Sequence, residues 1–160
     1  MISATSGSKL YIAGPHAAVT DTSAEYAALT WVEVKSISNL GDFGDEAAQI
    51  TVDHVGEGRT QKLKGTRNAG EMAVTASWDP LDPGQIAVRA AEKTSFAYDF
   101  KLEANDKADD NDTNSIFYFA ALVRSARRTQ GGPNDVVSMA MTLDVTTEIV
   151  EVPATVVANT

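Results

Sequence analysis

Residues 71–103 carry the sequence EMAVTASWDPLDPGQIAVRAAEKTSFAYDFKLE, which predicts a strand, a short helix and a second strand. Apolar side chains alternate with polar ones in the first part, and the same period of two returns near the end. Each strand therefore has one face for a core and one face for water. The apolar positions are Met72, Val74, Ala76 and Trp78, and then Phe96, Tyr98, Phe100 and Leu102.

Between these strands the sequence contains the residues that typically begin an α-helix. Asp82 suits the cap position, Pro83 suits the first helical position, and Gln85 completes an arrangement similar to a capping box. We predict a helix over about 83–94 that lies against the sheet. Its expected apolar face holds Ile86, Ala87, Ala90 and Ala91, and its expected polar face holds Gln85, Arg89, Glu92 and Lys93.

Four further segments predict strands. Residues 48–54 and 137–145 alternate in the same way, and His54 falls on the apolar phase, which predicts a core or interface histidine. Residues 29–37 are β-prone, and residues 115–123 are apolar on both faces, as in a strand that is covered from two sides. The predicted fold class is mainly β: an antiparallel β-sandwich or barrel with one flanking α-helix.

The length of 160 residues fits one domain, 1–160, with a single core. Residues 1–28 are small and polar, so we expect an extended N-terminal arm with one short strand near residues 10–12. The β core is expected over 29–149 and an extended C-terminal tail over 150–160. Residues 56–70, with four glycines and four basic residues, predict a long extended loop.

Two shorter segments also predict loops. Residues 105–114 (NDKADDNDTN) are acidic and contain almost no apolar side chain, and residues 129–135 (TQGGPND) concentrate turn-forming residues. Three acidic or amide side chains of the first segment have the alternate spacing of an EF-hand loop. Ser115 stands where that loop needs glycine and Ala121 where it needs glutamate, so the calcium motif fails.

The charge balance disfavours nucleic-acid binding. Thirteen Lys and Arg residues against 22 Asp and Glu residues give a formal net charge of −9, which repels phosphate groups. Basic residues gather in two stretches without an interleaved aromatic residue, so a solvated or subunit-contacting surface is favoured over a phosphate site. The stretches hold Arg59, Lys62, Lys64 and Arg67, and then Arg124, Arg127 and Arg128.

Catalytic chemistry has few candidates. The chain has no cysteine and only two histidines, His16 and His54, so thiol chemistry is excluded and a histidine-rich metal centre lacks ligands. We expect no enzyme activity, no metal and no cofactor. No apolar run approaches the length of a membrane span and the first residues lack a secretory pattern, so no membrane contact is expected.

The order of motifs resembles a known family. These are LTWVEVKSISNLGDFG (29–44), ITVDHVGEGRTQKLKG (50–65), WDPLDPGQIAVRAA (78–91), FAYDFKLEA (96–104) and ARRTQGGPNDVVSMAMTLDVT (126–146). Together they are similar to the major tail tube protein of phages with long non-contractile tails and of gene transfer agents. The resemblance covers nearly the whole chain, and the entry to the helix and the GPND turn weigh most.

The resemblance implies a structural virion protein in the tail, made in the host cytoplasm. Six copies would form a ring, and rings would stack into a tube through which DNA passes without specific binding. Its implied partners are itself, the tape measure protein, the tail terminator, and baseplate or distal tail proteins. The 56–70 loop corresponds to one that reaches a neighbouring subunit or ring, and the arm and tail correspond to stacking elements.

Two sets of residues follow for such an assembly. Basic residues of the loop would meet acidic residues across the subunit or ring contact, and polar positions of the strands would line the channel. The first set is Arg59, Lys62, Lys64, Arg67, Asp42, Asp45 and Glu46; the second is Gln49, Thr51, Asp53, Glu71, Thr75 and Asp144.

Two alternatives remain open. The first is the related tube protein of contractile injection machines or of type VI secretion, which shares the ring architecture. The second, from another class, is a monomeric carbohydrate-binding or adhesin module on a β-sandwich. Exposed aromatic side chains would favour that module, whereas the aromatic residues here fall mostly on buried strand phases.

Overall fold

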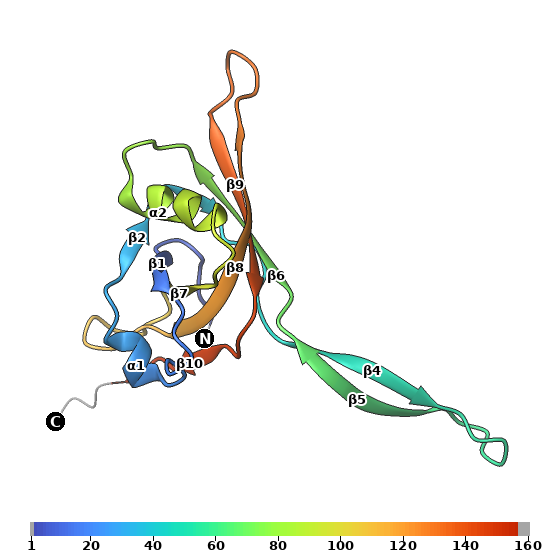
Figure 1. Ribbon diagram of the computed structural model, residues 1–160. Helices are drawn as coiled ribbons and strands as arrows, with labels where there is room; N and C mark the ends of the chain where they lie inside the picture. Colours follow the sequence, from blue (N-terminus) through green and yellow to red (C-terminus); the bar gives the residue numbers. More distant parts are fainter. Residues whose placement is uncertain (1, 157–160) are drawn as a thin grey trace.

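The structure, a computed structural model, describes residues 2–156 and is mainly β with antiparallel pairing, as predicted (Figure 1). An eight-stranded sheet forms the body, and a separate two-stranded hairpin projects from it. The elements are β1 (Lys9–Pro15), α1 (Ser23–Ala27), β2 (Val32–Val34), β3 (Ile37–Asn39), β4 (Glu46–Val52), β5 (Gln61–Asn68), β6 (Glu71–Ser77), α2 (Pro83–Glu92), β7 (Tyr98–Glu103), β8 (Ile116–Thr129), β9 (Ser138–Val145) and β10 (Val150–Val152).

The main sheet curls round until its two ends meet. Its strand order is β2-β1-β7-β8-β9-β6-β3, and β10 pairs with the first residues of β8. The strands at the two ends of this order, β2 and β3, are separated by only Lys35 and Ser36 in the chain. Such a closure, with β8 as the longest strand, gives the body a barrel-like shape.

The core lies on the concave face and is roofed by α2. The alternation predicted for β6 and β9 is confirmed, because the predicted apolar positions of these two strands are the buried ones. In β7 Phe100 and Leu102 are buried as predicted, but Phe96 lies before the strand and is 66% exposed, and Asp99 on the predicted wet face is buried because the segment after β1 covers it. Phe100 and Phe119 stack at 5.9 Å between ring centroids, below the buried Val88 and Ala91 of α2. The largest buried apolar side chains on this face are Leu10, Ile12, Met72, Met139, Met141 and Leu143.

Helix α2 begins as predicted, but a different face of it points inward. Asp82 caps the helix and accepts from the backbone N–H of Gln85 (3.2 Å). Gln85, expected in solvent, is 0% exposed, whereas Ile86, expected in the core, is 47% exposed. The helix is turned because Gln85 supplies hydrogen bonds that the sheet closure requires.

Those bonds lie where β2 turns into β3. The Gln85 Nε2 amide donates to the carbonyl oxygens of Lys35 (3.2 Å) and Ser77 (2.8 Å), and its Oε1 accepts from the backbone N–H of Asp79 (3.0 Å). Ser36 adopts a left-handed φ of 63°, and its carbonyl accepts from the backbone N–H of Ser77 (2.8 Å). The backbone groups at the β2–β3 turn that have no partner in a neighbouring strand are therefore hydrogen-bonded, as buried polar groups require.

The N-terminal segment is a correction to the expected arm. The predicted short strand near residues 10–12 is confirmed within β1, but β1 pairs with both β2 and β7 and is an inner strand of the sheet. A second helix, α1, follows, and Thr22 and Glu25 form its capping box. Part of the expected C-terminal tail is the strand β10, and residues 157–160 of that tail lie outside the described residues.

The segment 56–70 is also a correction, because it is not one long loop. Residues 61–68 form β5, which pairs with β4 in a hairpin, and only the residues between these strands form a turn. The predicted strand at 48–54 begins and ends two residues earlier. His54 therefore lies in the turn and is exposed, so the expected core position is wrong and a role at an interface stays a prediction. The acidic segment 105–114 is a loop, as predicted.

Substitution of Gly84 by alanine tests the contact between α2 and β2. A Cβ at Gly84 would lie 2.2 Å from the carbonyl oxygen of Glu33, so the helix has to move away from the strand. We expect a loss of about 1–3 kcal/mol in the free energy of unfolding, measured in urea. Gly58→Ala is the control, because no atom lies within 4 Å of its Cβ. An equal effect of both substitutions would contradict this close contact.

Candidate assembly interface

The β4–β5 hairpin leaves the main sheet and returns to it through two similar turns. The side-chain oxygen of Asn39 accepts from the backbone N–H of Gly41 (2.7 Å), and that of Asn68 accepts from Gly70 (2.9 Å). Both glycines have left-handed φ values, 67° and 69°, which favour glycine. A Cβ at Gly41 would also lie 2.2 Å from the carbonyl oxygen of Ala73. These two Asn-x-Gly turns fix the direction in which the hairpin projects (Figure 1).

One face of the hairpin is apolar, and we call Ala48, Ile50, Val52 and Leu63 its apolar face. Ile50 lies opposite Leu63 in the register, and their exposed fractions are 46% and 60%. A two-stranded hairpin without a covering layer is marginally stable in water. An exposed apolar face on such an element indicates that another surface covers it.

The opposite face is polar and positively charged, and we call Gln49, Thr51, Lys62 and Lys64 the cationic face. Lys64 lies opposite Gln49 and Lys62 lies opposite Thr51. Neither lysine takes part in an ion pair within residues 2–156. The cationic face therefore brings together residues that the sequence predicts for two different roles. Lys62 and Lys64 are predicted contact residues, and Gln49 and Thr51 are predicted channel residues.

The remaining predicted contact residues are divided between the base and the tip of the hairpin. At the base, Arg67 and Asp45 form an ion pair of 2.9 Å within the chain. Asp42 and Glu46 are exposed near this pair, and Arg59 is exposed in the turn at the tip. Part of the charge complementarity that was expected between subunits is therefore used inside one chain.

The predicted channel residues do not form one surface. Glu71, Thr75 and Asp144 lie on the convex face of the main sheet, where Glu71 is opposite Asp144 in the register of β6 and β9. Arg124 of β8 lies between their carboxylates: it pairs with Glu71, and its Nε is 3.6 Å from Asp144. Gln49 and Thr51 lie on the hairpin, and Asp53 follows the end of β4.

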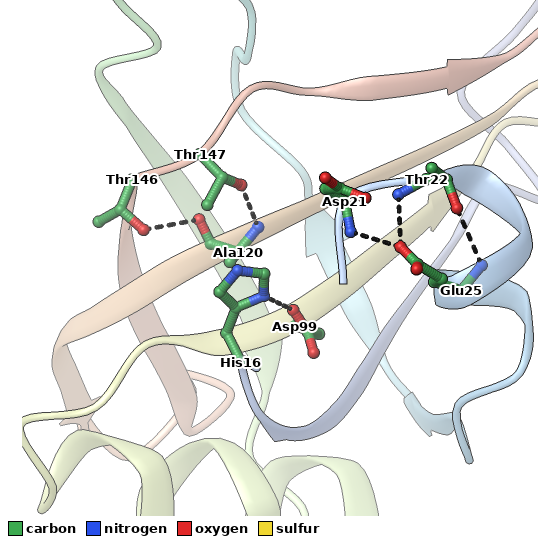
Figure 2. A network of polar contacts seen from close by, with 8 residues as sticks. All are labelled: His16, Asp21, Thr22, Glu25, Asp99, Ala120, Thr146 and Thr147. Atoms are coloured by element: carbon green, nitrogen blue, oxygen red, sulfur yellow. Dashed lines mark hydrogen bonds and ion pairs between the residues drawn. The ribbon is translucent and has the colours of Figure 1, made fainter. Parts of the chain in front are cut away.

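The segment after β1 covers the other part of the convex face, and sequence reasoning missed this contact (Figure 2). His16 Nδ1 lies 2.6 Å from a carboxylate oxygen of Asp99, which is 1% exposed. Tyr26 of α1 stacks on Tyr118 of β8 at 5.2 Å between ring centroids. The capping-box pattern of Thr22 and Glu25 was the one signal in the sequence for helix α1.

Hydrogen bonds beside this contact tie the end of β9 to β8. The backbone N–H of Ala120 donates to the hydroxyl of Thr147 (2.9 Å), and the hydroxyl of Thr146 donates to the carbonyl of Ala120 (3.2 Å), as Figure 2 shows. Burial raises the pKa of Asp99, and the hydrogen bond from His16 lowers it. The covered part of the convex face is therefore complete within one chain, unlike the hairpin.

Replacement of His16 by alanine tests this contact. At pH 7 the variant keeps Asp99 buried without its partner, and we expect a loss of about 1–3 kcal/mol in the free energy of unfolding. Without His16 the pKa of Asp99 rises further, so the folded variant holds the proton more tightly than the unfolded chain does. The penalty is then present above this raised pKa and is lost as the pH falls toward the ordinary carboxyl range.

The control is the double variant His16→Ala, Asp99→Asn, which has no carboxylate at this position. Urea unfolding at pH 7 should find the single variant less stable than the double one. The difference should shrink as the pH falls toward the ordinary carboxyl range, because Asp99 of the single variant then takes up its proton. A difference that is constant with pH would contradict the role of the ionised carboxylate.

Residues 2–156 hold no cluster of three or more histidine, aspartate or glutamate side chains arranged for a metal ion. None of their helices is long and apolar enough to cross a membrane.

No protein-family model and no curated protein matches this chain. Solved structures share its fold at low sequence identity. A chain of the anti-feeding prophage (AFP) baseplate aligns with a TM-score of 0.69 and 9% identity, over 96% of this chain and 97% of that one. The SPP1 tail tube aligns with a TM-score of 0.61 and 16% identity, over 90% and 75%.

A third structure is the sheath–tube complex of an extracellular contractile injection system, PVC. One of its chains aligns with a TM-score of 0.60 and 12% identity, over 95% of this chain and 92% of that one. At these identities the likeness concerns the fold. The structures that share the fold are thus a tail tube and a chain of a sheath–tube complex.

Proposed function

We propose that this protein is a structural subunit that assembles with copies of itself into a tube. The observation that carries the proposal is the β4–β5 hairpin, which projects from the body and exposes Ile50 and Leu63. The shared fold with the SPP1 tail tube and with a chain of the PVC sheath–tube complex supports the same reading. A hairpin of this kind is completed by a neighbouring copy.

Burial of the apolar face supplies a driving force for assembly. Full burial of an aliphatic side chain is worth about 1.5–3 kcal/mol, and each subunit contributes such a hairpin. The hairpin of one copy and the body of the next are different surfaces, and in this proposal their contact is heterologous and repeats from copy to copy. A repeating contact of this type closes into rings or extends into filaments.

The finer form of the proposal is a tail tube of the long non-contractile type. In it six copies form a ring, rings stack, and DNA passes along the axis without specific binding. The formal net charge of −9 per copy is consistent with a channel that repels phosphate groups. In such a virion the tape measure protein, the tail terminator and the baseplate or distal tail proteins would be the further partners.

The channel wall in this proposal is the open part of the convex face. It holds Glu71, Thr75 and Asp144, and Arg124 is flanked there by two carboxylates. A cation that is already paired twice offers DNA a weak anchor, and this group of three charges keeps a net negative charge. Screening over about 8 Å at physiological salt confines the repulsion to the region near the wall.

The tube of a contractile injection system is the second candidate. The AFP and PVC structures favour it, since they align over nearly the whole chain. The two candidates differ in the surrounding particle, because a contractile machine has a sheath around its tube. Electron micrographs of particles from the producing cells therefore separate them: a sheathed tail would reject the non-contractile form.

Negative-stain microscopy of the concentrated protein tests self-assembly. We expect rings or hollow tubes from the natural sequence and none from the variant Ile50→Asp, Leu63→Asp, since two buried unpaired carboxylates oppose the contact. The control variant Ile50→Val, Leu63→Val keeps the face apolar and should assemble. Both variants should unfold like the natural protein, because the hairpin lies outside the core. A natural protein that stays monomeric at high concentration would reject the proposal.

A further inference from the structure

We propose that the cationic face of the hairpin docks on the acidic loop, residues 105–114, of a second copy of this chain. This inference rests on the proposed function and names the partner surface of the hairpin. The apolar face and the cationic face point in opposite directions, so a hairpin between two neighbours contacts a different surface on each side. The cationic face then selects its neighbour by charge.

The acidic loop carries the matching charge in an accessible form. It holds Asp106, Asp109, Asp110 and Asp112 against the single basic residue Lys107. The Asp110 side chain is fully exposed, and its contact with Lys107 is 3.6 Å long. Asp109 is also exposed. These two carboxylates are therefore available to a positively charged partner.

The loop is anchored so that it presents these carboxylates from a fixed base. The side-chain oxygen of Asn114 accepts from the backbone N–H groups of Asp106 (3.2 Å) and Lys107 (3.0 Å). The Asp106 carboxylate accepts from the backbone N–H (2.8 Å) and the hydroxyl (2.6 Å) of Ser115, and these bonds lower the pKa of Asp106. A loop held at its ends loses less entropy when a partner binds.

One chain cannot bring these two surfaces together. In Figure 1 the hairpin projects to the lower right, whereas the loop between β7 and β8 lies beside α1 on the opposite side of the body. The two Asn-x-Gly turns hold the hairpin in that direction. The contact therefore needs a second copy, and when it repeats from copy to copy it builds a ring or a stack.

The acidic residues named from the sequence fit this role less well. Asp45 is already paired with Arg67 of its own chain at 2.9 Å. Asp42 and Glu46 lie at the base of the same hairpin, close to that pair. The acidic loop offers more carboxylates, and in Figure 1 it lies on the opposite side of the body from the hairpin.

Charge reversal tests the contact. The variants Lys62→Glu, Lys64→Glu and Asp109→Lys, Asp110→Lys should each slow assembly roughly tenfold, measured by light scattering at low salt and by counting tubes in micrographs. A 1:1 mixture of these two variants should assemble, because each reversed hairpin finds a reversed loop and each natural hairpin finds a natural loop. The fourfold variant that combines all substitutions should assemble as well.

The matched control is Asp42→Lys, Glu46→Lys, combined with Lys62→Glu, Lys64→Glu. If this control restores assembly and the reversed acidic loop does not, the inference is wrong although the protein forms tubes. Unchanged assembly of the Lys62→Glu, Lys64→Glu variant also overturns it. Failure of the proposed function looks different, because the natural sequence itself then forms neither rings nor tubes.

Discussion

A β-hairpin that projects from the body without a covering layer is the constraint on which the rest depends. Within residues 2–156 each strand of the β4–β5 hairpin pairs only with the other, so the outer edges present unpaired backbone groups and the apolar face meets water. The direction of the hairpin is nevertheless fixed, because two Asn-x-Gly turns hold it away from the sheet. A hairpin that is marginally stable alone and yet held in a fixed direction is the basis of the proposed contact with a second copy.

The body is built as a rigid support for that element. The sheet closes on itself at Lys35 and Ser36, and Gln85 pairs the backbone groups that the closure frees. The hairpin joins β3 to β6, which are neighbours in this closed sheet. Movement of the hairpin base therefore requires movement of the closed sheet, and a stiff support lowers the entropic cost of docking.

Sequence periodicity predicted those strands whose second layer lies within the same chain. β6 and β9 each bury one face against the core, so apolar and polar residues alternate clearly. β5 carries Leu63 as its only large apolar side chain, and Leu63 is exposed, so the sequence of this strand has no apolar period to detect. The polar core residue Gln85 was missed because its partners are backbone carbonyls, which have no sequence signal.

The same reasoning bears on the charged residues that the sequence predicts for a contact between subunits, whose pairing stays a prediction. A basic stretch and acidic stretches are visible in composition, whereas their mutual positions depend on the hairpin direction. Asp45 lies near the basic stretch in the sequence and forms an ion pair with Arg67 of the same chain. The acidic loop is distant from that stretch in the sequence and lies on the other side of the body. The cationic face and the acidic loop have opposite charges and lie on two sides of one chain, and the apolar face of the hairpin is exposed as well. This arrangement favours an assembly that grows by addition of identical copies over a closed pair.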